Sequence, residues 1–494
     1  MDKKFVKSLG KDTLLYIPSK IIPGLLGFFS LIMYTRLLKP EEYGRYTLVI
    51  TIMSFLIVFI FSWLEQSVLR FNKKYEDNSK EFFSTILTVT VYLSIFLSMI
   101  YIVSTYVFFN FEYEVQILIN LSAILLPLKV IYKIFMQIFR AKREAKFYSI
   151  ISVILKFVYL FLTFIMIYFL GFREESMFFA FIITYIIFIF FQIQKLKSIA
   201  NFHYSFNHIN KSYLKKFFRY GSPWIGMAIG SFLLSKFDRY IINYFLNAEI
   251  VGIYSATYSL AENSIMQFVS LLSISTLPVL INSYEEDEND NSSLMMKELF
   301  KVYAIVFIPA IFGLIFLSKD IINIFLGDKF QGGNLVFIII SIGAFFEALR
   351  NLVGRPFQLK EKTIYLPFLL LISGAINLIL NIVFVPILGM EGAAIATLIG
   401  YMFYFIIAYF ISLKFFVWLI PWNTIMKSLI SAIIMFLILY IQPVFINISI
   451  INLILDIFIG FTTYFIILYL FKEEIVLHIF NIVIYKFKER GKNK

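Results

Sequence analysis

Ionisable side chains interrupt several long apolar segments of this chain. The basic ones are Lys20, Lys129, Lys133, Lys156, Lys236, Arg239 and Arg350. A charge at the centre of a membrane span costs about 2.5–3.5 kcal/mol on the insertion scale, so such groups tend to face a cavity or a partner. Lys129 and Lys133 are spaced to share one helical face, and so are Lys236 and Arg239. A water-filled cavity lined by these residues would attract an anion, and phosphate is the best chemical match.

The acidic side chains inside apolar segments are fewer. Asp238, Glu262 and Glu347 are the candidates for coupling transport to protons or sodium. Two other interpretations stay open for each embedded charge. Long side chains near a helix end can reach the membrane surface, and others can form structural ion pairs between helices.

Other kinds of chemistry find no support in the sequence. The chain has no cysteine, which excludes disulfides and thiol catalysis, and its three histidines share no plausible metal site. We find no nucleophile elbow, phosphate-binding glycine loop or metal-binding spacing. We therefore expect no metal, no cofactor and no enzymatic activity, and we assign the net charge of +13 to membrane topology instead of nucleic acid.

The composition indicates a membrane protein. Hydrophobic residues make up 60% of the 494 residues and charged residues only 15%. A water-soluble surface needs more charge, so most of the outside must face lipid. We predict an all-α integral membrane protein with about fourteen transmembrane helices. The expected spans are 12–37, 42–67, 82–109, 115–140, 148–170, 175–194, 217–246, 249–281, 297–318, 334–357, 363–386, 391–411, 424–444 and 449–471.

A repeated phrase indicates internal duplication. LKPEEYGRY at 38–46 and LNAEIVGIY at 246–254 share the pattern L-x-x-E-x-x-G-x-Y, and the second copy starts 208 residues after the first. Six spans in each copy predict a parallel repeat of two lobes, with the substrate path between them. The expected division is 1–200 and 201–415 for the six-helix lobes and 416–494 for two further helices and a basic tail.

Basic residues alternate between loops. They are dense at both ends of the chain, whereas the loops at 110–114, 247–249, 387–390 and 445–448 contain none. The positive-inside rule therefore places both termini in the cytoplasm. The acidic run at 285–290 is an exception, which we interpret as a solvated loop.

Four segments resemble the bacterial oligosaccharide flippases, the Wzx-like polysaccharide exporters of a superfamily that also includes multidrug antiporters and lipid II flippases. They are SKIIPGLLGFFSLIMYTRLLKPEEYGRYTLVI, IFRAKREAKFYS, KFDRYIINYFLNAEIVGIYSATYSL and NLILNIVFVPILGMEGAAIAT. The resemblance implies a two-lobed bacterial cytoplasmic-membrane protein that moves undecaprenyl-diphosphate-linked repeat units by alternating access. It also places Asp238 at the family's acidic position in the seventh span. Ser19 and Lys20 stand where the lipid II branch has an Arg-Asp pair, which argues against that branch.

Three functions are weighed. A lipid-linked oligosaccharide flippase ranks first, with membrane lipid, protons or sodium, and a polysaccharide polymerase as further partners. A multidrug or ion-coupled antiporter of the same fold would need an acidic cavity, and this interior is mainly basic. A membrane-embedded glycan polymerase would need a long external loop, and no outward loop is long.

Overall fold

The structure is a computed structural model that describes residues 18–199, 205, 209–286, 290–441, 449–478 and 480. Within these ranges the secondary structure is helical and no strand occurs, as the composition predicts. The helices are α2 (Pro18–Leu37), α3 (Pro40–Phe71), α4 (Ser79–Phe108), α5 (Tyr113–Ala141), α6 (Ala145–Tyr168), α7 (Glu175–Lys197), α8 (Lys211–Ser235), α9 (Asp238–Phe245), α10 (Ala248–Glu286), α11 (Asp290–Phe316), α12 (Ser318–Phe325), η1 (Asp328–Phe330), α13 (Asn334–Val353), α14 (Arg355–Leu359), α15 (Tyr365–Ser412), α16 (Trp422–Ile441) and α17 (Ser449–Leu470).

Many of these helices are suited to a bilayer. Among the described residues, ten helices are long and apolar enough to cross a membrane, and 21–37 forms a shorter apolar helix. The chain is therefore a multi-pass membrane protein by the length and composition of its helices. The count of fourteen spans and the internal repeat stay predictions.

Two of the expected spans differ from the helices observed. The span expected at 217–246 is divided at Lys236 and Phe237 into α8 and α9. The carboxylate of Asp238 accepts a hydrogen bond from the backbone N–H of Arg239 at 2.9 Å, so this side chain competes for a backbone group at the start of α9. The sequence predicts Lys236 and Arg239 within one helix, whereas the structure has Lys236 in the break before α9. The span expected at 334–357 is likewise divided, into α13 and α14 at Gly354.

Local sequence signals explain several helix boundaries. Pro40 occupies the first turn of α3, where its missing N–H costs nothing, and Glu42 accepts a hydrogen bond from the backbone N–H of Lys39 at 2.8 Å. Asn210 caps α8 by accepting from the backbone N–H groups of Ser212 and Tyr213. Gly389 has φ of 63°, which breaks α15 between the expected spans 363–386 and 391–411.

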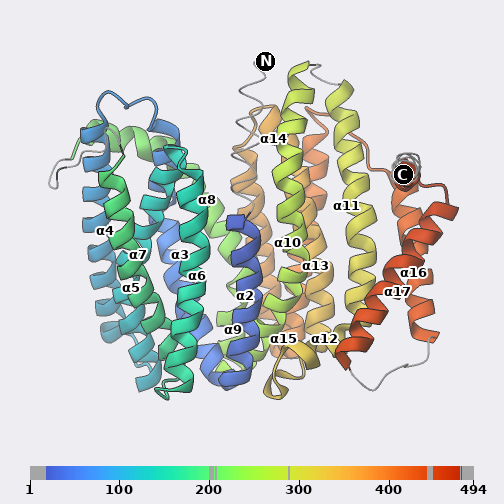
Figure 1. The fold of residues 1–494 in the computed structure, drawn as a ribbon, viewed down its shortest axis with the longest axis horizontal. Coiled ribbons are helices and arrows are strands. Elements are labelled where there is room, and N and C mark those ends of the chain that lie inside the picture. Colours follow the sequence, from blue (N-terminus) through green and yellow to red (C-terminus); the bar gives the residue numbers. More distant parts are fainter. Residues whose placement is uncertain are drawn as a thin grey trace, which may run out of the picture. The chain divides into compact units, whose positions relative to one another are not determined.

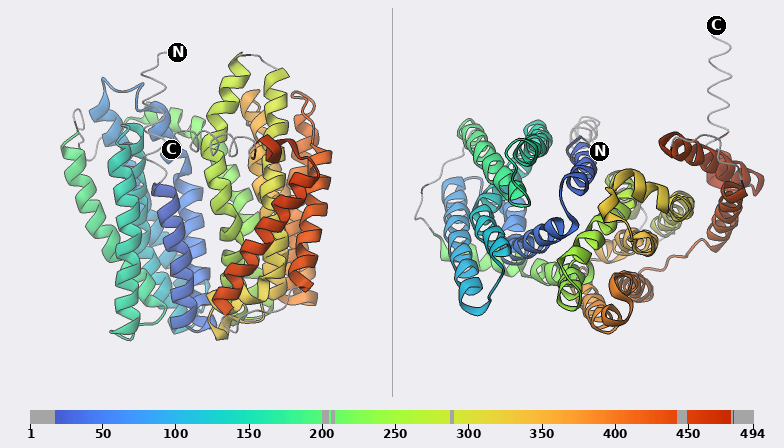
Figure 2. Two further views of the ribbon diagram at one scale, coloured as in Figure 1. Left: turned by 45° about the vertical axis from the view of Figure 1, so that its right-hand side comes forward. Right: turned by 90° about the horizontal axis from the view of Figure 1, so that it is seen from below.

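The chain divides into two compact units. Unit 1 comprises Met1–Ala256 and Ile364–Ala396, and unit 2 comprises Thr257–Thr363 and Thr397–Lys494. In unit 1, α3 packs mainly against α8 and α5, and α5 against α7 and α4. The end-on view in Figure 2 shows these helices standing roughly parallel. In unit 2, α11 packs mainly against α16 and α13.

The two copies of the repeated phrase lie against each other in unit 1. A Cβ added at Gly44 would stand 1.9 Å from the carbonyl oxygen of Ala248, and one added at Gly252 would stand 1.8 Å from that of Pro40. Only glycine permits so close an approach of two backbones. The glycine of each copy thus provides the surface on which the first turns of the other copy's helix pack.

Candidate functional site

Three of the predicted basic residues lie near one another in unit 1. Lys129 and Lys133 project from α5 and Lys156 from α6, and Lys129 lies within electrostatic range of the other two. We call Lys129, Lys133 and Lys156 the lysine cluster. All three side chains are half-buried although they belong to the middle part of apolar helices.

The members of the lysine cluster differ in their partners. Lys133 Nζ forms an ion pair with Glu65 Oε1 at 2.8 Å. Lys129 Nζ donates only to the hydroxyl of Ser54, at 3.1 Å, and Lys156 Nζ lies 5.1 Å from the ring centroid of Tyr159. Within the described part of the chain, neither Lys129 nor Lys156 has a carboxylate at ion-pair distance. Among the described residues, the one carboxylate at ion-pair distance from this cluster is therefore that of Glu65, which pairs with Lys133.

Hydroxyl groups stand beside this charge. The Tyr34 hydroxyl donates to the Tyr159 hydroxyl at 2.6 Å, which joins α2 to α6. The rings of Tyr34, Tyr43 and Tyr46 lie 6.1–6.3 Å apart. Ammonium and hydroxyl donors in one region can hydrogen-bond to phosphate oxygens. Sequence reasoning missed these tyrosines, although Tyr46 ends the repeated phrase.

Asp238 and Arg239 form a separate, fully paired site. Arg239 Nη1 lies 2.8 Å from Asp238 Oδ1, and the two side chains are only 2% and 1% exposed. The Tyr254 hydroxyl donates to the other carboxylate oxygen of Asp238, and the Arg239 guanidinium also donates to the backbone carbonyl of Ser235. This network connects α9 to α8 and α10. Lys236, at the break before α9, is half-buried.

The remaining predicted residues lie in unit 2. Arg350 forms an ion pair with Glu347 at 3.2 Å on α13. Tyr401 lies within electrostatic range of Arg350, Glu347 and Glu262, and its hydroxyl lies 3.4 Å from that of Tyr258. The predicted basic set thus occupies several places and does not form a single described ring. The side chain of Lys20 falls outside the described side chains.

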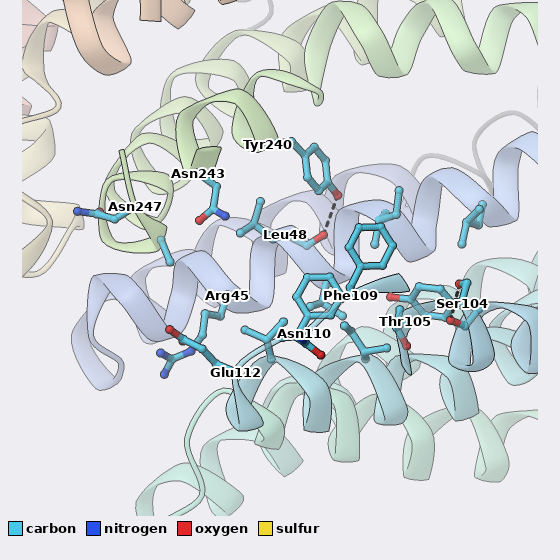
Figure 3. A pocket seen from close by; sticks show the side chains of 18 of the residues that line it. Arg45, Leu48, Ser104, Thr105, Phe109, Asn110, Glu112, Tyr240, Asn243 and Asn247 are labelled. Carbon is cyan, nitrogen blue, oxygen red and sulfur yellow. Dashed lines mark hydrogen bonds between the residues drawn. The ribbon is translucent and has the colours of Figure 1, made fainter. Parts of the chain in front are cut away.

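A cavity of about 740 Å³ opens in unit 1 between α3, α4, α5 and α9. Leu48, Ile52 and Leu97 give its walls an apolar surface. Figure 3 shows Leu48 on α3 facing the cavity. The Tyr240 hydroxyl bridges α9 to α3 by donating to the backbone carbonyl of Leu48 at 2.8 Å. Polar side chains gather where the four helices begin or end, and we call this set the rim: Glu41, Arg45, Asn110, Glu112, Asn243 and Asn247.

Sequence reasoning did not identify this cavity, since none of the predicted site residues lines it. The rim residues lie at helix ends, where polar side chains are ordinary, so their types alone give no signal. Among the residues that the structure describes, no group of three His, Asp or Glu side chains could hold a metal ion.

Comparison with known proteins identifies a family and several relatives of this chain. The chain matches the family described as "Polysaccharide biosynthesis protein" over residues 33–333. It is 26% identical over 227 residues to the probable low-salt glycan biosynthesis flippase Agl15 of Haloferax volcanii, covering 45% of this chain and 48% of that relative. It is 24% identical over 336 residues to the capsular polysaccharide biosynthesis protein CapF of Staphylococcus aureus, covering 66% of this chain and 80% of that protein.

A solved structure shares the fold. The lipid II flippase MurJ in an inward closed conformation superposes with a TM-score of 0.77 at 18% identity, covering 94% of this chain and 100% of that chain. At this identity the likeness concerns the fold alone, and it confirms the all-helical membrane fold that the sequence predicts. Because the family match spans more than half of the sequence, this chain belongs to the polysaccharide biosynthesis protein family.

Proposed function

We propose that this protein is a flippase that carries lipid-linked anionic glycans across the cytoplasmic membrane for surface polysaccharide assembly. The observation that supports this most is the lysine cluster, in which Lys129 and Lys156 have no carboxylate partner among the described residues. A buried charge without a partner is costly, so its presence favours a ligand of opposite charge. A diphosphate linked to a polyprenol such as undecaprenol is the proposed anion.

The geometry of α3 and α10 supports alternating access as the proposed mechanism. The reciprocal contacts of Gly44 and Gly252 hold the first turns of these two helices together at the end that loop charges predict to face outward. In the proposed mechanism this close contact holds the outward end together in the conformation observed. The break at Lys236 and Phe237 provides a second point of bending.

The two other functions fit the charges less well. A cation antiporter would need acidic groups deep in the membrane, whereas the acidic rim of the cavity lies at helix ends and the unpaired groups of the lysine cluster are basic. A glycan polymerase would need a long outward loop. The relatives are named as flippases and polysaccharide biosynthesis proteins, which favours transport over catalysis.

The proposal also includes the membrane topology of the chain and the ion that drives transport. Both termini are placed in the cytoplasm, with six-helix lobes at 1–200 and 201–415 and a C-terminal pair of helices within 416–494. Coupling to protons or sodium is assigned to an embedded acid, with Asp238 as the first candidate before Glu262 and Glu347. A polysaccharide polymerase is the proposed functional partner.

Deletion of the gene in the native host tests the proposed function. We expect a lipid-linked saccharide to accumulate and surface glycan to fall, both measured by mass spectrometry of extracted lipids and of cell-surface polymer. Complementation with the intact gene should reverse both changes. Unchanged surface glycan without any accumulated intermediate would contradict the proposal.

A further inference from the structure

The cavity between α3, α4, α5 and α9 is apolar inside and polar at its rim. The proposed transport function assigns no role to this cavity. Leu48, Ile52, Leu56, Leu97 and Ile119 give its inner walls an apolar surface, while the rim holds amides, carboxylates and one guanidinium. A volume of about 740 Å³ lies within the range of ligand sites, about 300–1,000 Å³. Such a cavity matches an amphiphile whose head lies at the rim and whose chain runs along α3.

The charges of the rim exclude an anionic head. Arg45 is its basic residue, and this guanidinium is already held by Glu41 at 2.8 Å and by Glu174 at 2.7 Å. Glu112 adds a further carboxylate with no side-chain partner among the described residues. The local field is therefore negative and repels phosphate.

Several rim groups remain available for hydrogen bonds. In the described part of the chain, the side chains of Asn110, Glu112 and Asn243 have no hydrogen-bond partner. Figure 3 shows Asn110 and Glu112 on one side of the cavity and Asn243 on the opposite side. Amides both donate and accept, and a carboxylate accepts, which suits a ligand rich in hydroxyl groups.

Two aromatic side chains, Phe109 and Phe111, also line the cavity beside the rim. Phe109 and Phe111 stack with ring centroids 5.3 Å apart and an interplanar angle of 17°, and both rings are exposed. Exposed aromatic faces beside amides and carboxylates provide the two contacts that a sugar ring makes, through its C–H face and its hydroxyl edge. The ammonium of a zwitterionic head would be attracted by the carboxylates, but such a head offers fewer hydroxyl groups to the amides of Asn110 and Asn243 than a sugar does.

We propose that this cavity is a binding site for a neutral glycolipid, with the sugar at the rim and the hydrocarbon chain along α3 and α4. The site is distinct from the lysine cluster. Ile119 lines the cavity and Lys129 follows ten residues later on α5, about 15 Å along the helix axis. The proposal does not depend on which substrate the protein transports.

Binding of defined lipids to the full chain tests the proposal. The protein in nanodiscs of phosphatidylcholine would receive a monoglucosyl diacylglycerol, a phosphatidylglycerol or a phosphatidylethanolamine with the same acyl chains, and native mass spectrometry would count retained lipid. We expect the glucosyl lipid to be retained at least about tenfold better than the other two, the difference that 1.4 kcal/mol produces. Equal retention of all three, or preference for phosphatidylglycerol, would overturn the proposal.

Two rim variants and two controls locate the site. Asn243→Ala and Glu112→Gln should each reduce retention of the glucosyl lipid about three- to tenfold, because each removes or weakens hydrogen-bonding groups. Asn423→Ala, an exposed asparagine of α16 outside this cavity, should leave retention unchanged. Lys129→Met/Lys156→Met should also leave it unchanged, which separates this site from the proposed transport site. Retention by both rim variants at the level of the intact protein would contradict the proposal.

Discussion

Unit 1 contains two polar regions whose excess charges have opposite signs. Side chains of α3 contribute to both regions. The lysine cluster has basic groups in excess, since only Lys133 has a carboxylate partner within the described residues. At the rim of the cavity the excess is acidic, because the guanidinium of Arg45 is shared by two carboxylates. An anion is therefore attracted to the middle of the unit and repelled at the rim. This difference would favour release of a diphosphate head once it leaves the lysines.

The lysine cluster also differs from the Asp238–Arg239 network in how many of its charges have a partner of opposite charge. The buried pair is held by two further hydrogen bonds, so its charges are satisfied inside the protein. Lys129 and Lys156 have only a hydroxyl and an aromatic face beside them. We therefore assign the paired charges to packing and, under the proposed function, the unpaired charges to binding of an anion. The predictions below test this distinction.

The largest effect is expected where α3 meets α10, because the two backbones approach each other so closely there. Gly44→Ala/Gly252→Ala would place each new Cβ within 2 Å of a backbone oxygen, and overpacking costs about 1–3 kcal/mol per site or more. We expect loss of folded protein in size-exclusion chromatography. Gly27→Ala is the matched control, because nothing lies within 4 Å of its added Cβ. Normal folding of the double variant would show that the two helices do not need this contact.

A large loss of stability is expected at the paired network. Asp238→Asn leaves the Arg239 guanidinium buried without its carboxylate, and breaking a buried pair costs about 3–5 kcal/mol. The Tm of the purified variant should fall clearly. An unchanged Tm would place Asp238 with the unpaired charges and strengthen its candidacy for ion coupling. Transport that keeps its dependence on the proton gradient in this variant would exclude that coupling role.

Features of the fold that depend on neighbouring residues could be predicted from the sequence, whereas features that depend on contacts between distant residues could not. Helix positions follow from hydrophobic runs, so α5, α6, α7 and α16 begin and end within a few residues of expectation. The division at Lys236 depends on one carboxylate binding a backbone N–H, which periodicity does not reveal. The repeated phrase was visible in the sequence, but the reciprocal packing of its two glycines requires the fold.

The site could be predicted only in part for the same reason. The spacing of Lys129 and Lys133 predicts that they share a face, and Lys129 lies within electrostatic range of both Lys133 and Lys156. Pairing depends on other helices: Glu65 of α3 pairs with Lys133, and among the residues that the structure describes no carboxylate pairs with Lys129. The rim of the cavity combines residues from distant helix ends, so no local pattern indicates it.

A moderate effect is expected from the neutralised member of the lysine cluster. Lys133→Met removes the partner of Glu65, whose side chain is 12% exposed, and an unsatisfied buried group costs about 1–3 kcal/mol. The free energy of unfolding should fall by that amount in denaturant titration. Adding Glu65→Gln should recover most of the loss. A double variant as unstable as the single one would mean that the ion pair is not the cause.

The smallest effect, and one of opposite sign, is expected for the unpaired lysines. Lys129→Met/Lys156→Met removes two charges that repel each other and lack a carboxylate, so the Tm should rise by about 1–4 °C. A structural role for these lysines would instead lower the Tm. Differential scanning fluorimetry of the detergent-solubilised protein distinguishes the two outcomes.

The central claim is that the unpaired charges of the lysine cluster bind the anionic head of the transported lipid. Its most direct test is the rate of flipping of a fluorescent polyprenyl-diphosphate saccharide in proteoliposomes, measured by accessibility to a membrane-impermeant quencher. We expect Lys129→Met/Lys156→Met to reduce the rate at least about tenfold, and Lys129→Arg/Lys156→Arg, which keeps the charge, to retain a substantial part of it. Flipping by the methionine variant at the rate of the intact protein, with equal amounts of folded protein, would contradict the claim.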